Sequence, residues 1–598
     1  MRRTAVITCT AILLCACTGG VHTLHVRPGD DPAAAIQKAV AHGGKTTIII
    51  HGGDYQLKDA LNISGAGRIS IRAAKGERPV LRGDIPLQPV PDAHNKSIFR
   101  IDLATAGISD FGEATGKQNR FDLYLNGLRQ IPARWPDSTY TRAGKVYGSG
   151  LPGPDTGTIT ADRAVFTDGV FECEAPRLTD WAAEKSGAIH AFARYDWFDT
   201  THRILSLDGN VVHVDTTGII YGFGDGFRFF AYNLLCEMDS PGEYHLDTGS
   251  GILSWYAPKG YDPVRDELSF SALNARSMLE IKDSEDVSIE GITFRGARNS
   301  AINILRSKGV RVSDCIIECV GGDGINVSNS KDVSVKGCRI EHCGHGGIRA
   351  IGGDRRKLEA AGYVFEHNLI RDFSELQYTY QAGIRFQGVG VIISGNEICE
   401  CPSSALNLAG NDIYVENNYF HDLVKESDDQ GALDIFGNYY YRGIVVRHNI
   451  WENITGRKDS QYGAAAVRLD DMICGVQITG NRFMNCGGNK FGAIQIHGGK
   501  DNFVENNVFE HCATGVSFAP WTEERWRDNT KGNVHNVTRF RDSVATGDPL
   551  YLQRYPPLKQ EIVSNVNRNY ILNNEFIGCS RIFFREFGNN VVEGNKIL

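Results

Sequence analysis

One short segment recurs along the second half of this 598-residue chain, and it restricts the fold more than any other feature of the sequence. Each copy alternates apolar and polar residues and ends in Cys or Asn; the clear copies are residues 310–315, 333–338, 363–368, 391–396, 413–418, 444–449, 476–481 and 502–507. Their final residues are 23, 30, 28, 22, 31, 32 and 26 residues apart, so the shortest spacing defines a basic coil and the longer ones add loops. A period of this size, built from strands, indicates a β-solenoid.

A second alternating segment follows each copy. The clearest examples are residues 432–437, 466–471 and 493–498, and their apolar positions are Leu433, Ile435, Val467, Leu469, Ile494 and Ile496. A period of two is the signal of a strand with one buried face. If successive coils align these strands about 4.8 Å apart, they form a parallel sheet with one polar surface. We therefore predict an all-β fold, a right-handed parallel β-helix.

The repeated Asn and Cys positions have structural explanations. Side-chain amides stacked at one turn of each coil bond to the coils above and below, as in the Asn ladders of stacked strands. A Cys follows five residues after several of these positions, at Cys343, Cys401, Cys486, Cys512 and Cys579. One thiol per coil at a fixed position indicates a column of buried small side chains, and we prefer this interpretation to a disulfide framework.

The N-terminus has the pattern of a targeting segment. Arg2 and Arg3 precede a short apolar run, so residues 1–16 are predicted to be a signal peptide. The run ends Leu-Cys-Ala-Cys, which resembles a bacterial lipobox and predicts lipidation of Cys17 and a tether over residues 17–30. An ordinary secretory signal cleaved nearby is the alternative. Either way we expect an extracytoplasmic protein, as an outer-membrane lipoprotein or in the periplasm.

Three further regions follow the tether. Asp31-Pro32-Ala33 begins a helix that Gly43-Gly44 ends, so residues 31–99 are predicted to be a capping helix and first coils. The repeat cannot be found over residues 100–270, which carry their own short strands and are predicted to be an inserted β-rich domain. Residues 271–598 are the predicted β-helix with the active-site groove.

The composition of the chain argues against several classes of binding partner. A net charge of −8 argues against nucleic acid, and no apolar run of the mature chain is long enough to span a membrane. The lipid anchor is then the one expected membrane contact, and we expect a monomer. No CxxC pair appears, so no zinc site is predicted, and no other metal or cofactor is predicted either.

The polar side of the second strand is where we expect the chemistry. In order along the coils its first column is Asn326, Arg349, Arg385, Asn407, Asp434, Arg468, Gln495 and Ser517. Two positions further along each strand come Ser328, Ile351, Gln387, Ala409, Phe436, Asp470, His497 and Ala519. Forked polar groups on a rigid sheet suit hydrogen bonding to sugar hydroxyls, so Arg385, Asp434, Arg468, Gln495 and His497 are predicted to bind a glycan.

Carboxylates gather at the same coils. Asp428 and Asp429 precede one strand, and Asp470 and Asp471 end the next. Asp434 and Asp470 should lie about 8 Å apart by strand and coil spacing, within the about 6.5–9.5 Å of an inverting glycosidase. We predict Asp429 and Asp470 as catalytic, with Asp470 as the acid because Asp471 is near, although the two roles could be exchanged.

Structural alternatives remain for several of these residues. Asp434 and Arg468 could form an ion pair, Asp471 could bond its own turn, and Asp428 could be a solvated turn residue. His497 could be a plain surface histidine. Aromatic residues that could stack on sugar rings, or else pack under loops, are Phe436, Tyr439, Tyr440, Tyr441, Trp521 and Trp526.

At this point the sequence resembles a known family. Residues 427–433, Ser-Asp-Asp-Gln-Gly-Ala-Leu, and 467–471, Val-Arg-Leu-Asp-Asp, are similar to signatures of glycoside hydrolase family 141. Residues 125–127, 133–136, 240–247 and 253–256 also resemble that family, so the likeness covers most of the mature chain. It implies a pectate-lyase-like β-helix and an inverting enzyme, an α-L-fucosidase or xylanase acting on plant cell-wall glycans.

The resemblance also bears on individual residues. By motif position it places the family's catalytic aspartates on Asp429 and Asp470. Leu433 and Asp434 stand where Ile-Tyr is usual, and Arg468 stands where the family has Tyr. These differences put the identity of the sugar in question.

Two other functions remain open from the sequence. A calcium-assisted polysaccharide lyase would use Arg385 or Arg468 near a uronate and bind calcium through the aspartates; calcium is the only cofactor considered, and only in this case. The absence of Lys beside the carboxylates argues against it. A glycan-binding surface protein without catalysis would depend on the aromatic platforms more than on paired aspartates.

Overall fold

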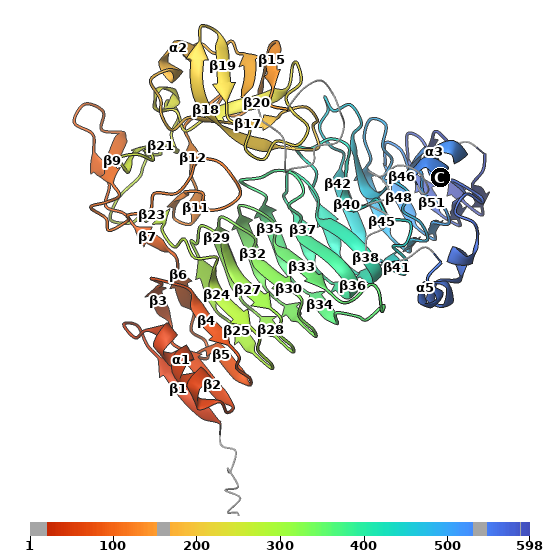
Figure 1. The fold of residues 1–598 in the computed structure, drawn as a ribbon, viewed down its shortest axis with the longest axis horizontal. Coiled ribbons are helices and arrows are strands. Elements are labelled where there is room, and N and C mark those ends of the chain that lie inside the picture. Colours follow the sequence, from red (N-terminus) through yellow and green to blue (C-terminus); the bar gives the residue numbers. More distant parts are fainter. Residues whose placement is uncertain (1–20, 152–167, 530–543, 545–546, 587) are drawn as a thin grey trace, which may run out of the picture.

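The fold is a right-handed parallel β-helix, as predicted (Figure 1). The computed structural model describes residues 21–151, 168–529, 544, 547–586 and 588–598. The predicted signal peptide and Cys17 lie outside the described residues. Among the described helices none is long and apolar enough to cross a membrane.

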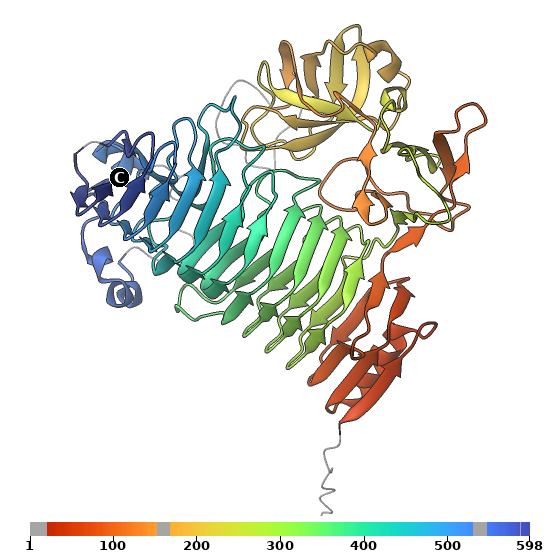
Figure 2. The same cartoon turned by 180° about the vertical axis from the view of Figure 1, so that it is seen from behind.

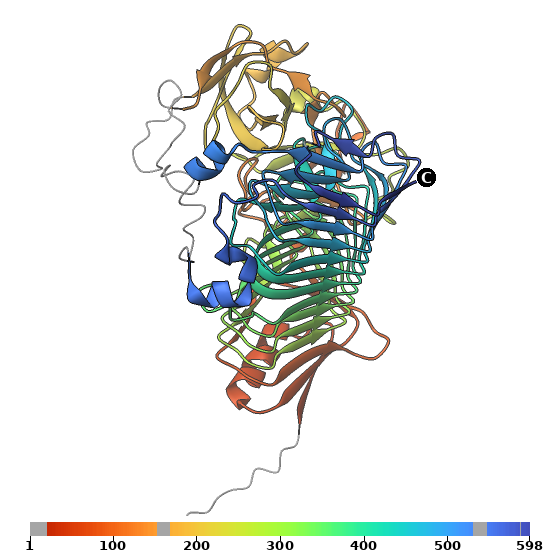
Figure 3. The ribbon, with the colours of Figure 1, turned by 90° about the vertical axis from the view of Figure 1, so that its right-hand side faces the viewer.

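Each regular coil contributes three strands, one more than the sequence predicted. The segments with the polar column form the face that we call the cleft face; its strands are β4 (Leu61–Ser64), β24 (Ser277–Lys282), β27 (Ser300–Leu305), β30 (Ile325–Ser328), β33 (Ile348–Gly352), β36 (Ile384–Ser394), β38 (Leu406–Glu416), β40 (Gln430–Phe436), β43 (Ala464–Asp470), β46 (Ile494–His497), β49 (Val516–Ala519) and β52 (Phe583–Phe584). Figure 3 shows the coils stacked along the helix axis.

The recurring Asn-terminated segment forms the second face. Its strands are β1 (His22–Val26), β2 (Thr46–Ile50), β5 (Ile69–Ala73), β25 (Ser288–Glu290), β28 (Arg311–Ser313), β31 (Ser334–Lys336), β34 (Tyr363–Glu366), β41 (Ile444–Arg447), β44 (Gln477–Thr479), β47 (Phe503–Glu505), β50 (Tyr570–Leu572) and β53 (Val591–Glu593), and the long β36 and β38 run from the cleft face into it.

The unpredicted strand of each coil forms the third face, a separate parallel sheet. It consists of β3 (Gly53–Gln56), β6 (Pro79–Arg82), β26 (Thr293–Arg295), β29 (Ile316–Val320), β32 (Arg339–Cys343), β35 (Leu369–Phe373), β37 (Glu397–Cys399), β39 (Tyr419–His421), β42 (Ile450–Ile454), β45 (Arg482–Cys486), β48 (Val508–Glu510), β51 (Glu575–Ile577) and β54 (Lys596–Ile597). Its inward side chains include an aromatic stack, in which the Phe420 and Trp451 ring centroids lie 4.2 Å apart.

The asparagine column is the ladder that the sequence predicts. The side-chain amide of Asn418 donates to Oδ1 of Asn449 at 2.9 Å, and Asn449 donates to Asn481 at the same distance. The ladder extends from Asn368 to Asn595. Because each buried amide finds its partner in the next coil, the ladder fixes the register between coils.

The cysteines are free thiols, as predicted. All those in the described part of the chain are unbridged, and Cys343, Cys401, Cys486 and Cys512 are buried. They lie where third-face strands end, a position that other coils fill with Phe373 or Ile454, so the predicted column of one thiol per coil is interrupted. The thiols contribute to packing and not to cross-linking.

The N-terminal end is capped by the predicted helix α1 (Pro32–His42). The Asp31 side chain accepts from the backbone N–H of Ala33 at 2.9 Å, and Gly43 ends the helix in the left-handed conformation. One expectation needs correction here, because part of the predicted tether 17–30 is the strand β1, paired in parallel with β2. From residue 22 the chain therefore already belongs to the first coil.

The chain leaves the β-helix after β6 and returns at β24, so the insertion begins earlier than residue 100. At its neck Arg82 bridges Asp84 at 2.9 Å and Glu267 at 2.7 Å. The described residues of the insertion, which exclude 152–167, form three sheets and two short helices, α2 (Leu178–Trp181) and η1 (Leu235–Glu237). The strands of these sheets are β7 (Asp84–Pro86), β8 (Val90–Pro91), β9 (Ile98–Asp102), β10 (Leu123–Leu125), β11 (Leu128–Arg129), β12 (Ile131–Pro132), β13 (Arg134–Trp135), β14 (Thr141–Arg142), β15 (Val146–Ser149), β16 (Gly169–Glu172), β17 (Ala188–Phe192), β18 (Thr200–Asp208), β19 (Val211–Val214), β20 (Arg228–Tyr232), β21 (Glu243–Asp247), β22 (Ile252–Tyr256) and β23 (Leu268–Ser271).

The insertion lies over one edge of the β-helix. Figures 1 and 2 show the sheet of β17 to β20 beyond the loops that enter the middle coils. Late in the chain, α3 (Glu523–Arg527), α5 (Pro549–Arg554) and η3 (Pro556–Lys559) pack around a small apolar cluster that contains Tyr439 and Trp526. The α5 helix lies beside the middle coils, where Tyr551 donates to the backbone carbonyl of Arg355 at 2.8 Å.

Candidate active site

The predicted polar column exists and is in register. Asn326 pairs with Arg349, Arg349 with Arg385, and Arg385 with Asn407. The column continues from Asn407 through Asp434, Arg468, Gln495 and Ser517. The alternate residues Leu433, Ile435, Val467 and Leu469 are buried in the core, so the strands present their polar sides outwards.

A cleft of about 490 Å³ lies over the middle of this column. Its polar lining includes Arg385, Gln387, Asn407, Asp429, Asp434, Arg468, Asp470, Asp471 and His497. Trp197 and Tyr221 of the insertion and Tyr380 of the loop before β36 complete its wall. The cleft is thus closed on one side by chain that is distant in sequence.

A loop of the insertion is bound to the turns that enter the cleft face. Asp199 accepts from the backbone N–H groups of Tyr378 at 2.7 Å and Thr379 at 2.9 Å. Arg228 bridges Asp196 at 2.6 Å and also donates to the backbone carbonyl of Glu426. These bonds place the Trp197 ring at the mouth of the cleft.

The centre of the cleft is one guanidinium surrounded by carboxylates. Arg468 Nη2 lies 2.8 Å from Asp429 Oδ1, and Nη1 lies 2.9 Å from Asp470 Oδ2 and 3.6 Å from Asp434 Oδ2. Arg468 is 8% exposed, so these are desolvated contacts and not a surface ion pair. The predicted pairing of Asp434 with Arg468 is therefore confirmed as part of a larger cluster.

The next coil adds an imidazole to this cluster. His497 Nδ1 donates to Asp470 Oδ1 at 2.8 Å and lies 3.4 Å from Asp471 Oδ1. Trp521 packs edge-on against the His497 ring with centroids 5.6 Å apart. The imidazole is thus held between the carboxylates and an aromatic wall, which is not the environment of a plain surface histidine.

The carboxyl groups of the cluster differ in acidity. Burial raises the pKa of Asp434 to about 7 and that of Asp429 to about 6, because Arg468 offsets only part of the desolvation. Burial acts on Asp470 too, but Arg468 and the hydrogen bond from His497 bring its pKa below the ordinary value. We expected Asp471 to raise the pKa of Asp470; the direction is the opposite, because Arg468 and His497 make the closer contacts.

Backbone geometry contributes to this placement. Asp429 and Asp471 both have a left-handed backbone, with φ of 54° and 44°. Asp is one of the residues that tolerate this conformation, which here occurs on the turns at either end of cleft-face strands. Both carboxyl groups reach the cleft from these turns.

Two predicted ligands of the substrate do not line the cleft. Asp428 is buried and accepts from the backbone N–H groups of Gln461 at 2.7 Å and Gly463 at 2.6 Å, so it holds a loop in place. Gln495 is also buried, and its side-chain oxygen accepts from the Ser517 hydroxyl. Both carry out structural bonding, whereas Arg385, Asp434, Arg468, Asp471 and His497 line the cleft as predicted.

The aromatic residues divide between two roles. Phe436 is 48% exposed and lines the cleft together with Tyr441. Tyr439, Tyr440, Trp521 and Trp526 are instead buried under the C-terminal segment. Phe436 and Tyr441 are therefore the rings of this set that line the cleft, and the others pack under loops.

The structure adds ring residues that the sequence did not single out. Trp197 stacks on Tyr195 with centroids 4.1 Å apart and an interplanar angle of 7°. Tyr221 and Tyr380 line the same wall. The only sequence signal was the concentration of aromatic and acidic residues over residues 195–199, and nothing in the repeat connects that stretch to the groove.

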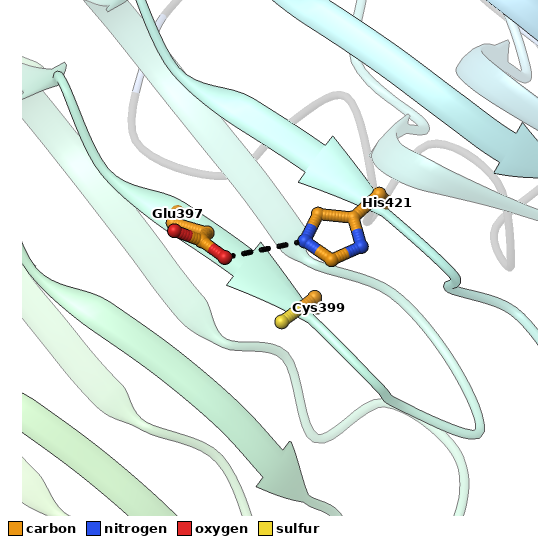
Figure 4. Close-up of side chains that lie close together, drawn as sticks. All are labelled: Glu397, Cys399 and His421. Carbon is orange, nitrogen blue, oxygen red and sulfur yellow. Dashed lines mark hydrogen bonds and ion pairs between the residues drawn. The ribbon is translucent and has the colours of Figure 1, made fainter.

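Within the part of the chain that the structure describes, two groups of side chains have donors placed close enough for a metal ion. In the cleft these are Asp470, Asp471 and His497, but Arg468 contacts Asp470, and its positive charge opposes a cation there. The other group, Glu397, Cys399 and His421, lies on the third face (Figure 4). Its oxygen, sulfur and nitrogen donors are those of zinc sites, yet none of them lines the cleft.

Comparisons with known proteins support the fold. A family model described as right handed beta helix region matches residues 265–374 and 382–533. A solved structure described as a glycoside hydrolase is similar with a TM-score of 0.59 at 12% identity, and the match covers 96% of each chain. The search of curated proteins gives no match.

Other solved structures resemble the chain more weakly. XylC in complex with xylose gives a TM-score of 0.48 at 14% identity, covering 96% of this chain and 86% of that one. DFA-IIIase from Arthrobacter chlorophenolicus A6 in complex with DFA-III gives 0.36 at 10% identity, covering 96% of both. At such identities the likeness concerns the fold.

Proposed function

We propose that the protein is a glycoside hydrolase that cleaves plant cell-wall glycans of the xylan or fucoside type. The observation that carries this proposal is the coexistence, in one aromatic-walled cleft, of carboxyl groups with raised and with lowered pKa. Hydrolysis of a glycosidic bond needs such a pair, because one group must donate a proton while the other accepts one. The structural likeness to a solved glycoside hydrolase and the sequence resemblance to glycoside hydrolase family 141 agree with this assignment.

Asp470 has the properties of the base. Its contacts with Arg468 and His497 keep it ionised at neutral pH, and it lines the cleft. In the proposed reaction the Asp470 carboxylate removes a proton from water as the water attacks the anomeric carbon. Arg468 and His497 then stabilise the carboxylate position and orient it.

The acid is one of the two carboxyl groups whose pKa is raised. Asp434 has the higher pKa and the longer contact with Arg468, at 3.6 Å, so it keeps its proton best near neutral pH. Asp429, the acid or base expected from the family motif, is bound more closely to Arg468 at 2.8 Å. We therefore assign Asp434 as the proton donor. Asp429 then shares the guanidinium of Arg468 with Asp470.

Inversion of configuration is part of the proposal. The carboxyl groups of Asp429 and Asp434 contact the guanidinium of Arg468, whereas Asp470 also contacts His497 through its second oxygen. One carboxyl group can therefore act on the attacking water while a different one protonates the leaving group. An inverting enzyme has its carboxyl groups about 6.5–9.5 Å apart with water between them. The nearest oxygens of Asp434 and Asp470 both contact Arg468 Nη1, at 3.6 and 2.9 Å, so this pair is closer than the expected 8 Å and at or below the lower limit of that range. Inversion is therefore proposed from the family resemblance. No metal or other cofactor is assigned to any step.

The proposed setting is extracytoplasmic, through the signal peptide and lipidation of Cys17. A lipid anchor on Cys17 would be the membrane contact, and the monomer would act on poly- or oligosaccharides. Palmitate labelling of cells that express the full chain tests this: the wild type should incorporate label, and Cys17→Ala should not. Label in both proteins, or in neither, would contradict the anchor.

The stereochemistry of the reaction tests the proposal. The wild type is incubated with xylan- and fucose-containing cell-wall oligosaccharides, and the anomeric proton of the first product is followed by NMR. We expect cleavage with the anomer opposite to that of the substrate. Retention would remove the inverting mechanism, and the absence of any cleaved glycosidic bond across the panel would remove the hydrolase.

A further inference from the structure

A second polar cleft continues the first along the same face. It has a volume of about 890 Å³, and Arg385 lines both clefts, so the two form one groove. The strands beneath the second cleft carry Asn303, Asn326, Arg349 and Arg385 in consecutive coils. A chain-like ligand could therefore contact this column and the carboxyl cluster at the same time.

Two arginines lie directly against each other in the second cleft. Arg349 and Arg385 are register partners on β33 and β36, about 4.8 Å apart by strand spacing. Both side chains are exposed in the groove, and neither makes a hydrogen bond or ion pair with the described residues. Partial desolvation and then the charge of Arg349 lower the pKa of Arg385, as expected for a cation beside another.

The other charged groups of the second cleft do not cancel this charge. Lys117 and Arg276 add positive charge, and Asp323 is the acidic side chain of the lining. Asp323 already accepts from the backbone N–H of Gly346 at 3.0 Å. The second cleft is thus cationic on a chain whose formal net charge is −8.

Like charges in directly opposed positions of a sheet destabilise it, and the attraction of Asp323, the one carboxylate of the described lining, offsets only part of the repulsion between the two arginines. An anion bound between the two guanidinium groups would relieve it. Arginine forks are suited to planar or tetrahedral oxyanions, with which they form two parallel charge-assisted hydrogen bonds. Neutral sugar hydroxyls would leave the repulsion in place.

We propose that Arg349 and Arg385 form a subsite for an anionic sugar of the glycan, through a uronate carboxylate or a sulfate ester. This inference rests on the proposed glycan substrate and specifies its charge. Arg385 and Arg349 are two and three coils from Asp434, or about 10 and 14 Å along the axis. The anionic unit therefore binds at a distance from the bond that is cleaved.

Binding by the Asp470→Asn protein, measured by calorimetry, tests the subsite without turnover. The probes are oligogalacturonate, its fully methyl-esterified form, and a sulfated oligosaccharide of similar length. We expect one of the two anionic probes to bind at least about tenfold more tightly than the neutral ester, and which one identifies the anionic group. Equal affinity for all three probes would overturn the proposal.

Charge-removing variants connect this preference to the two arginines. In the Asp470→Asn background, Arg349→Gln and Arg385→Gln should each weaken binding of the preferred anion about tenfold more than binding of the neutral ester. Arg311→Gln, on the second face, is the matched control and should change neither. If the control weakens binding equally, the effect is one of net charge and the subsite is wrong.

The outcomes also separate this inference from the proposed function. Anion-selective binding that depends on Arg349 and Arg385, together with no hydrolysis by the wild type, would support the subsite and refute the hydrolase. Hydrolysis of neutral glycans with no preference for anionic ones would support the hydrolase and refute the subsite. Unfolding temperatures of all variants, compared with the wild type, identify any loss that comes from misfolding.

Discussion

Replacing Asp434 with Asn should stabilise the protein in a pH-dependent way. Asp434 is buried, and its pKa in the folded protein is raised from 3.8 to about 7. A difference of one in pKa corresponds to about 1.4 kcal/mol, so ionising Asp434 in the folded state costs about 4 kcal/mol. Such a cost is expected at a site where function and not stability selects the side chain.

The direction in which stability changes with pH follows from proton binding. Because the folded-state pKa lies above the unfolded value, the folded protein binds this proton more tightly, and stability falls as pH rises from about 4 to about 7. Asn has nearly the same shape and no proton to lose. Asp434→Asn should therefore match the wild type near pH 4 and exceed its free energy of unfolding by up to about 4 kcal/mol at pH 8.

Guanidinium unfolding followed by tryptophan fluorescence at pH 4.5 and pH 8 measures this difference without knowledge of the substrate. Asp286→Asn is the matched control, since Asp286 is an exposed aspartate on a turn outside the cleft. Its replacement should alter stability little at either pH. A stability difference for Asp434→Asn that is the same at both pH values, or a loss at pH 8, would refute the reasoning about the cluster.

Three other predictions follow from the same cluster. With a substrate in hand, kcat/KM should fall as pH rises through about 6 to 7, where Asp429 and Asp434 lose their protons, and a profile still rising at pH 8 would contradict the acid assignment. Arg468→Gln should cost about 3–5 kcal/mol of stability, measured by chemical unfolding, because it leaves buried carboxylates without their cation; a cost below about 1 kcal/mol would show that the contacts are weak. Chelation by EDTA should leave activity unchanged, since the positive charge of Arg468 at 2.9 Å from Asp470 opposes a cation there; loss of activity restored by calcium would favour the lyase.

Much of the cleft face could be predicted because a solenoid converts sequence period into spatial register. Once the Asn ladder fixes one position per coil, the neighbours of Asp434 follow by counting, and Arg385, Asn407 and Arg468 lie where the column placed them. The same counting predicted buried thiols at Cys486 and Cys512. The sequence did not predict the strand of the third face, but this omission left the register of the cleft face unchanged.

Other parts of the site depend on contacts that no period encodes. Trp197 reaches the cleft only because Asp199 and Arg228 attach the insertion to turns far along the chain. Asp428 and Asp429 are adjacent in sequence, yet one carboxyl group turns to loop amides and the other to Arg468. The direction of such turns is a tertiary property.

The acidity of Asp470 shows a related limit. Its neighbour in sequence, Asp471, suggested a raised pKa, but the groups in closest contact are Arg468 and His497 from the same and the next coil. The pKa of a buried group depends on distances in space and on desolvation, so its direction could not be read from adjacency in sequence.

The most direct test of the account incubates wild type and Asp470→Asn with mixed plant cell-wall oligosaccharides and follows two signals together. New reducing ends report cleavage of glycosidic bonds, and ultraviolet absorbance of unsaturated uronates reports elimination. Wild type should give reducing ends without absorbance, and Asp470→Asn should give neither signal while it still unfolds in one cooperative transition above the assay temperature. Absorbance in the wild type, or full activity in the variant, would contradict it.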